Sequence, residues 1–200
     1  MEMDLSLVDD FESFIRSLLA KTIWDFDVSD AGFGQDGLDQ ILSDFRADYK
    51  RYFPEHTAIT GAAVVNTPPL IGILMYRTAR YLFLKKREAL ALPISNAGRY
   101  WSLSELYYSA AIGKGLKINH GIGLIVGARS VIGENCLLHQ NITIGDRKGG
   151  RPTLGNNIIV YPGASILGGI TIGDNSVIAA HTLVLSDVSP SAVVKGIHKL

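Results

Sequence analysis

The sequence has almost no cysteine, since Cys136 is the only one in 200 residues. A lone cysteine excludes a disulfide framework within the chain and a cysteine metal cage. Long hydrophobic runs are also missing: the longest apolar stretch, PPLIGILMY, stops at Arg77 after nine residues, too short to cross a bilayer. The N-terminal stretch MEMDLSLVDDFESF is acidic and lacks the basic region of a signal peptide. We therefore expect a cytoplasmic protein that does not enter a membrane.

An excess of either charge is missing too, because 19 basic and 19 acidic residues cancel. The two signs are unevenly placed: residues 1–50 hold 12 acidic and 4 basic residues, whereas 51–200 hold 7 and 15. No basic stripe gathers in one segment, so nucleic-acid binding is not expected. A hydrophobic content of 47% and a charged content of 19% are typical of a globular protein. This balance is compatible with a small anionic ligand held by a few basic side chains.

The first half of the sequence has the apolar periodicity of helices. The pattern predicts helices over 5–20 and 38–52, and a third over about 68–90 that begins with a Pro-Pro pair. The aromatic residues of these stripes are expected in the core. We assign residues 1–97 to an α-helical N-terminal domain, within which the acidic segment 1–37 has no assigned role.

From about residue 100 the apolar period changes to six. This spacing fits neither a helix nor an alternating strand, and it is the signature of a parallel β-helix in which the aliphatic residue of each hexad points inward. Thirteen hexads make a little over four coils of three hexads each, so we assign 98–189 to a β-helix and 190–200 to a C-terminal tail. Two residues are inserted after Ile118 and four after Ile144. The repeating residues are Leu106, Ile112, Ile118, Val126, Ile132, Leu138, Ile144, Leu154, Val160, Ile166, Ile172, Ile178 and Val184.

Three stretches carry a resemblance to a known family. They are FRADYKRYFPE (45–55), TPPLIGILMYRTARYLF (67–83) and SELYYSAAIGKGLKINHGIGLIVGARSVIGEN (104–135), the last with a histidine and glycines at the two-residue insertion. They resemble the hexapeptide-repeat acyltransferases, and among these the serine O-acetyltransferases, over about residues 40–197. The resemblance implies a left-handed parallel β-helix, acetyl-CoA-dependent O-acetyl transfer, and a homotrimer or dimer of trimers with active sites between neighbouring solenoids.

Acetyl transfer from a thioester to a hydroxyl needs a base for the hydroxyl proton. Imidazole suits this task because its ordinary pKa lies near neutrality. His120 falls where the hexads break step, so its side chain should point out of the solenoid. The resemblance places the catalytic histidine at His120 and its orienting carboxylate at Glu105, 15 residues earlier and less than one 18-residue coil away. Such a carboxylate would fix the imidazole tautomer and stabilise the imidazolium.

The acceptor-binding positions depart from the family pattern. Asn119 stands where the family usually has an aspartate, and Phe53 where it has a second aspartate before a proline. Arg151 replaces the histidine of an arginine-histidine pair, and its planar guanidinium could grip a carboxylate or phosphate. Gln140, one coil after the catalytic position, is a further substrate-binding candidate. We expect an acceptor that is serine or a similar small hydroxyl compound, or alternatively a sugar or polysaccharide intermediate.

Acetyl-CoA is the expected co-substrate, and no metal is expected. Its pantetheine arm needs a surface with backbone donors and acceptors and no large side chains, which small residues of the later coils would provide. The final segment VVKGIHKL resembles the family segment that crosses the cofactor, and the longer tail that docks onto cysteine synthase is absent from it, so no cysteine synthase complex is expected. The predicted cofactor-binding residues are Gly145, Gly163, Ala164, Ala179, Ala180, Lys195 and Gly196.

Two other functions are compatible with a hexapeptide solenoid. A zinc hydratase would need three converging histidines, yet no two histidines of the hexad region lie within five residues of each other. His139 and His181 are interpreted as structural, although His139 could line the same cleft as His120. A non-catalytic scaffold would keep the solenoid without the chemistry. Replacing His120 with alanine separates scaffold from enzyme.

Overall fold

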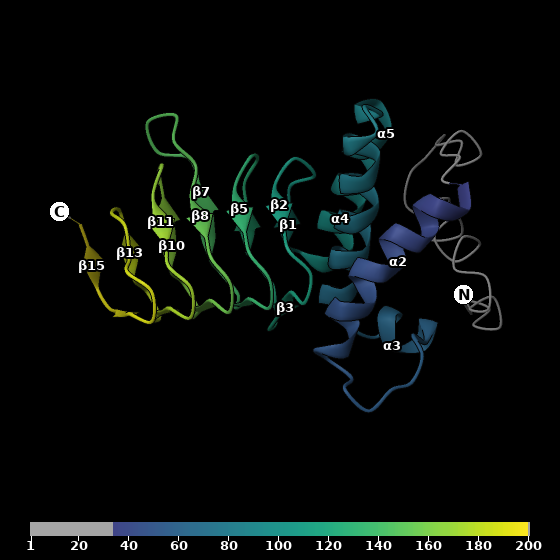
Figure 1. The fold of residues 1–200 in the computed structure, drawn as a ribbon, viewed down its shortest axis with the longest axis horizontal. Coiled ribbons are helices and arrows are strands. Elements are labelled where there is room, and N and C mark those ends of the chain that lie inside the picture. The colour runs from purple at the N-terminus through teal and green to yellow at the C-terminus, as the bar shows by residue number, and fades with distance from the viewer. Residues whose placement is uncertain (1–33, 200) are drawn as a thin grey trace.

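The computed structural model describes residues 34–199, so the helix predicted over 5–20 lies outside the described residues. The described chain consists of a helical part and a β-solenoid that follow each other along the long axis (Figure 1). The helices are α2 (Gly34–Lys50), α3 (Gly61–Val65), α4 (Pro68–Leu84) and α5 (Glu88–Ser102). Between residues 34 and 199, no helix is both long and apolar enough to span a membrane.

The predicted apolar stripes of the first half form the core of the helical part. In α2 the stripe residues Leu38, Ile41, Phe45 and Tyr49 are all buried. α4 begins with two prolines, whose missing N–H groups cost little in a first turn where no helical acceptor exists. Because α4 packs against both α2 and α5, most of its residues are buried.

The single helix predicted over about 68–90 is two helices in the structure, which is a correction with a local cause. Lys86 takes a left-handed φ of 61°, its N–H bonds to the Phe83 carbonyl, and the Arg87 N–H bonds to the Leu82 carbonyl. This pair of bonds is the Schellman arrangement that ends helices, usually with glycine at the left-handed position. A lysine there gives no stop signal. Pro93 lies inside α5, and because proline usually interrupts a helix, the sequence does not indicate α5 clearly either.

The second half forms short parallel strands stacked in three sheets. The first sheet has the order β1-β4-β7-β10-β13-β15, the second β11-β8-β5-β2 and the third β14-β12-β9-β6-β3. Each of the first four coils contributes one strand to each sheet, and β13, β14 and β15 extend the first and third sheets, which gives the prism in Figure 1. The strands are β1 (Glu105–Leu106), β2 (Ala111–Ile112), β3 (Lys117–Ile118), β4 (Ile125–Val126), β5 (Val131–Ile132), β6 (Leu137–Leu138), β7 (Thr143–Gly145), β8 (Thr153–Leu154), β9 (Ile159–Val160), β10 (Ser165–Leu167), β11 (Thr171–Ile172), β12 (Val177–Ile178), β13 (Leu183–Val184), β14 (Val193–Val194) and β15 (Ile197–His198).

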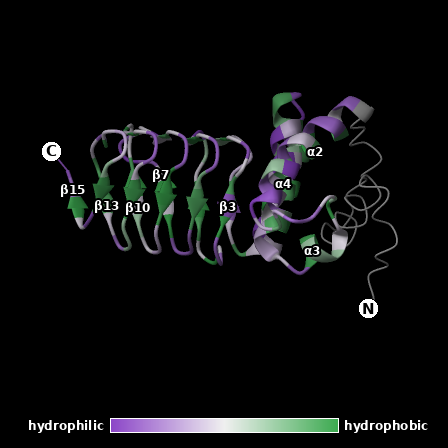
Figure 2. Ribbon diagram, turned by 60° about the horizontal axis from the view of Figure 1, so that its bottom comes forward, coloured by the Kyte–Doolittle hydropathy of each residue, from purple (hydrophilic) through white to green (hydrophobic). Residues whose placement is uncertain are grey.

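The hexad prediction is confirmed residue by residue. Every one of the thirteen repeating residues is the second residue of its strand in β1 to β13, and all are buried. Hydrophobic strands and more hydrophilic turns alternate along the solenoid in Figure 2. The register also locates the insertions: Leu106 pairs with Val126, twenty residues on, whereas Val126 pairs with Ile144, eighteen residues on. The two extra residues therefore lie in the turn between β3 and β4, and the segment 190–200 adds β14 and β15 to the sheets.

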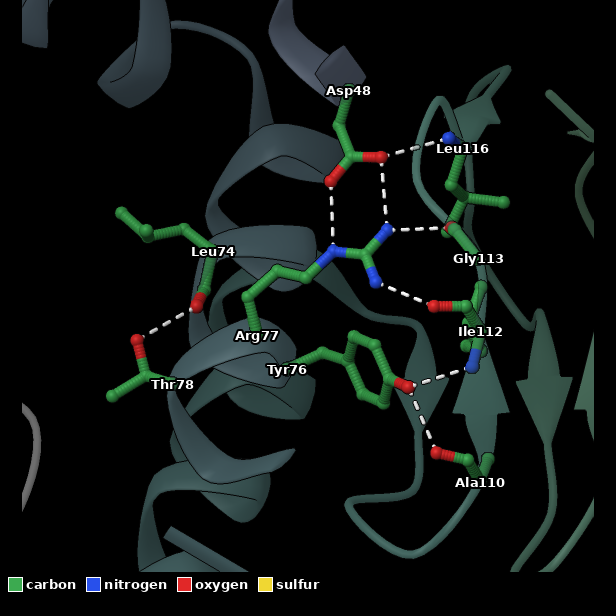
Figure 3. A network of polar contacts seen from close by, with 9 residues as sticks. All are labelled: Asp48, Leu74, Tyr76, Arg77, Thr78, Ala110, Ile112, Gly113 and Leu116. Carbon is green, nitrogen blue, oxygen red and sulfur yellow. Dashed lines mark hydrogen bonds and ion pairs between the residues drawn. The ribbon is translucent and has the colours of Figure 1, made fainter. Parts of the chain in front are cut away.

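The helical part closes the first coil, whose outer strand edges have no further coil to pair with. Tyr76 and Arg77 of α4 and Asp48 of α2 take up these backbone groups (Figure 3). The Arg77 guanidinium binds both carboxylate oxygens of Asp48 at 2.9 Å and donates to the carbonyls of Ile112 and Gly113. Asp48 in turn accepts from the Leu116 N–H at 2.8 Å. Buried polar groups are thus fully paired at the junction, as they must be to avoid a desolvation cost.

Candidate active site

One edge of the prism gathers most of the predicted site residues. It consists of the turns that lead from the third sheet to the first, and we call it the His120 edge. Backbone bonds stack these turns in register, because Asn119 N donates to Leu138 O, His139 N to Val160 O and Ala179 N to Val194 O. The turns are residues 119–124, 139–142, 161–164, 179–182 and 195–196.

His120 occupies the enlarged turn between β3 and β4. Its φ is 63°, and the Gly121 N–H bonds back to the Asn119 carbonyl at 2.8 Å, so His120 is the central residue of a tight three-residue turn. A side chain in this left-handed region is unfavourable and needs surrounding structure to hold it. The ring is exposed, and within residues 34–199 it forms no hydrogen bond. The side chain thus lies outside the solenoid interior, the position expected from the break in the hexads.

A pocket of about 410 Å³ opens beside this ring, between the helical part and the first coil. Its walls come from the segment after α2, from the start of α4 and from the turn after β3. Among the described residues that line it, the only side chain that can carry a positive charge is His120, and none is a carboxylate. The lining residues are Tyr52, Asn66, Thr67, Pro68, Pro69, Ile118, Asn119 and His120.

The main chain of Glu105 adjoins this turn, whereas its side chain is paired elsewhere. The Glu105 N–H donates to Leu124 O, and Glu105 pairs with Ile125 across β1 and β4. Glu105 therefore lies in the strand next to the end of the turn. The carboxylate, however, forms an ion pair with Arg99 Nη1 at 3.0 Å. The Glu105 side chain is 24% exposed and that of Arg99 63%, so this ion pair is a solvated contact of small energy.

A second histidine, His139, lies on the same edge in the next coil along the chain. The ring of His139 stacks on Tyr161, with centroids 5.1 Å apart and planes inclined by 21°. Burial lowers the pKa of His139, and the nearby His120 lowers it further. The adjacent Gln140 has a buried Oε1 that lacks a hydrogen-bond partner in the described part of the chain. Gln140 belongs to the turn that stacks on the His120 turn, and its unpaired oxygen is covered by the surrounding chain.

The predicted cofactor residues divide into positions that are at least partly exposed and positions that are buried. Gly163, Ala179, Ala180, Lys195 and Gly196 all lie on the His120 edge, above His120. A Cβ at Gly163 would lie 2.5 Å from His181 Nδ1, so the glycine makes room for that ring, whereas Gly196 faces open space. The remaining two, Gly145 and Ala164, are buried, and their side-chain positions offer no surface to a ligand in the single chain.

Arg151 is not brought to His120 within one chain. It follows the four-residue insertion after β7, where the segment 146–150 folds back on itself through an Arg147–Gly150 bridge and projects from the top of the solenoid in Figure 1. This turn joins the first sheet to the second, a different edge of the prism. The guanidinium donates to Ala128 O at 2.9 Å and forms an ion pair with Asp146.

Several pocket residues were not predicted from the sequence. Tyr52 and the Asn66–Pro69 segment reach the pocket only through tertiary packing, for which the sequence carries no signal. Tyr161 could have been found, because counting the inserted residues places it in the column of Asn119 and His139.

Cys136 is not a competing nucleophile: burial raises the pKa of its thiol to about 11, which keeps it protonated at neutral pH. Within residues 34–199 no three metal-ligating side chains cluster.

Comparisons with known proteins match this geometry. The model of the family described as bacterial transferase hexapeptide (six repeats) matches residues 151–186. The serine acetyltransferase of Helicobacter pylori is 35% identical over 133 residues, which cover 64% of this chain and 78% of that protein. That of Synechococcus elongatus is 32% identical over 162 residues, covering 78% of this chain, and the chain spans 65% of that relative's length.

Solved structures are similar over most of the chain. The Neisseria gonorrhoeae serine acetyltransferase in complex with serine has a TM-score of 0.78 and 27% identity, covering 92% of this chain and 80% of that one. A serine acetyltransferase complex with CoA has a TM-score of 0.73 and 26% identity, covering 84% and 71%. The hexad strands and the matching family model define a hexapeptide-repeat transferase built on a left-handed parallel β-helix. Within that class, the chain belongs to the serine acetyltransferase family, which is a family of acyltransferases.

Proposed function

We propose that this protein transfers the acetyl group of acetyl-CoA to the hydroxyl of serine, with His120 as the general base. The observation that carries the proposal is the exposed His120 ring, held in a strained turn at the mouth of a pocket of about 410 Å³. Its nitrogens have no partner in residues 34–199, which suits a group that must exchange a proton with a substrate.

In the proposed reaction, the His120 imidazole first accepts a proton and then returns it. Acetyl-CoA supplies an acetyl group already activated as a thioester. One nitrogen of His120 accepts the proton of the acceptor hydroxyl while the oxygen attacks the thioester carbonyl. As the carbon–sulfur bond breaks, the same nitrogen returns the proton to the departing sulfur. The products are the O-acetyl ester and the free thiol of CoA, and the histidine ends as it began.

Glu105 is proposed as the carboxylate that orients the ring during this proton exchange. The register is consistent with this role, since Glu105 pairs with Ile125 directly after the His120 turn, and the carboxylate would leave Arg99 by changing its rotamer. Because the Arg99 contact is mostly solvated, giving it up costs little, roughly 0.2–1 kcal/mol. Arg99 would then be a resting partner of Glu105 rather than a catalytic one.

The His120 edge is the proposed track for CoA. Gly196 faces open space and Ala180 is exposed, so a flexible pantetheine arm would meet backbone groups there without side-chain obstruction. Lys195, exposed at the far end, is placed to meet a phosphate. Gly145 and Ala164 would take part only through their main chain.

We also propose that the active site is completed by a neighbouring chain in a trimer. Arg151 lies on another edge of the prism, so within one chain it cannot belong to the pocket beside His120. In a threefold arrangement, one chain's 146–151 loop can face the His120 edge of the next. Arg151 would then offer its guanidinium to the acceptor carboxylate.

Thiol release from acetyl-CoA by the purified protein tests the proposed activity. We expect turnover with serine, read as free CoA thiol, and O-acetylserine as the product identified by mass spectrometry. Among residues 34–199 no carboxylate lines the pocket to pair with an ammonium, so a panel of neutral hydroxyl compounds and sugars should be assayed in parallel. Turnover with a sugar and none with serine would overturn the choice of acceptor while leaving the chemistry in place.

Replacing Glu105 with glutamine is expected to lower kcat at least about tenfold, because an amide orients the imidazole without stabilising its charged form. The matched control is Arg99→Met, which removes the other half of the observed ion pair. This control should keep kcat or raise it, since it frees the carboxylate. Equal losses in both variants would mean that the ion pair acts only as a structural unit, against the role given to Glu105.

A further inference from the structure

Strand β3 is the end strand of the third sheet, and its outer edge faces the helical part instead of another coil. Lys117 and Asn119 direct their N–H groups to the next coil, at Cys136 O and Leu138 O. Ile118, between them, therefore directs its N–H and carbonyl outward. Left without partners at a buried junction, these two groups would carry a desolvation cost.

A single phenol hydroxyl satisfies both groups. Tyr52 Oη accepts a hydrogen bond from Ile118 N at 2.7 Å and donates one to Ile118 O at 2.9 Å. Burial raises the pKa of the Tyr52 hydroxyl well above its ordinary value, so the group stays neutral and keeps both roles over the working pH range. Tyr52 thereby replaces the coil that β3 lacks.

The held residue directly precedes the strained turn that carries the candidate base. Ile118 also packs on the far side of that turn, because a Cβ on Gly121 would lie 3.1 Å from Ile118 Cγ2. A shift of Ile118 would therefore move both ends of the tight turn around His120. Tyr52 in addition lines the same pocket as His120.

We propose that Tyr52 is a positioning residue that acts through the main chain of Ile118 to fix the His120 turn against the acceptor pocket. This inference rests on the function proposed above and adds a residue of the helical part to the active site. Both hydrogen bonds of the hydroxyl go to the main chain of Ile118, and neither goes to the His120 ring. Its effect is geometric, and misplacement of a reacting group by about 1 Å can cost on the order of 100-fold in rate.

The chain provides a matched control for the test. Tyr76 Oη makes the same kind of bracket on the neighbouring end strand β2, accepting from Ile112 N at 2.9 Å and donating to Ala110 O at 2.8 Å. Tyr76 lies outside the pocket beside His120. Tyr52→Phe and Tyr76→Phe thus each remove two hydrogen bonds from a junction strand, and only the first does so next to the base.

Both variants are expected to lower the urea midpoint of unfolding to a similar degree. Only Tyr52→Phe should lower kcat, by about tenfold or more, with the KM for acetyl-CoA within twofold of the parent value. Tyr76→Phe should keep kcat within about twofold. Equal falls in kcat in the two variants would overturn the proposal, because a merely structural hydroxyl would give that result. A parental kcat in Tyr52→Phe would also overturn it, because the hydroxyl would then not affect the reaction.

Hydrogen exchange gives a readout that needs no activity. Amides of the peptide covering residues 118–124 should exchange faster in Tyr52→Phe than in the parent, and at the parental rate in Tyr76→Phe. Unchanged exchange of this peptide in Tyr52→Phe would reject the positioning role even if the protein proved to have another activity. Absence of acetyl transfer in the parent protein, with the exchange result as expected, would instead reject the proposed function and keep the structural role.

Discussion

Replacement of His120 by alanine is expected to lower kcat of acetyl transfer by about 10²- to 10⁴-fold, the usual contribution of a positioned general base. The KM for acetyl-CoA should change little, because the proposed cofactor track lies on the turns above this one. The measurement is thiol release under saturating acetyl-CoA. A residual rate is expected, because bringing the two substrates together is itself a source of rate enhancement that does not depend on the base.

Asn175→Ala is the control for the backbone. Asn175 has a similar φ, 62°, in an exposed turn between β11 and β12, which belongs neither to the His120 edge nor to the edge that carries Arg151. An alanine there meets the same left-handed strain without touching the pocket, so this variant should retain the parental kcat. A kcat in His120→Ala within about threefold of the parent would contradict the base assignment, and a parallel loss in Asn175→Ala would point to the turn conformation rather than the ring.

The solenoid could be predicted almost completely because its pattern is local. Each hexad places one aliphatic residue inward, and the same count that identifies Leu106 also identifies Val184. The helical part is less readable, because its elements depend on how they pack. The left-handed residue that ends α4 is Lys86, a residue type that does not signal a helix end in the sequence. The helix α5 contains a proline, which usually argues against a helix.

The stacking of the site's turns along one edge could be predicted from the sequence, whereas the contacts of its side chains could not. Counting hexads places His120 at the enlarged turn and aligns it with the later turns of the same edge, which the register confirms. The counts do not say that Glu105 pairs with Arg99, or that Arg151 pairs with Asp146. Tyr52 is separated from Ile118 by 66 residues, and no periodic pattern connects them.

Replacement of Arg77 by methionine is expected to lower the free energy of unfolding by about 3–5 kcal/mol, because it leaves the Asp48 carboxylate buried without its partner. Asp48 is 0% exposed, and the lost guanidinium also bonds the carbonyls of Ile112 and Gly113 at the first coil. Urea unfolding measures the loss. Arg80→Met is the control: Arg80 is a half-buried neighbour on α4 that donates to Ser109 O at 3.1 Å, and its loss should cost about 1 kcal/mol.

The stability of Arg77→Met should depend on pH in a definite direction. Burial already raises the pKa of Asp48 against the opposing pull of Arg77, and without the arginine only the raising effect remains. The folded variant then binds a proton more tightly than the unfolded chain, so its stability increases as the pH falls through the raised pKa. The deficit relative to the parent should therefore be smaller at pH 5 than at pH 8. A deficit that is equal at both values would mean that Asp48 gains solvent or another partner when Arg77 is lost, and that the ion pair is not what joins the helices to the first coil.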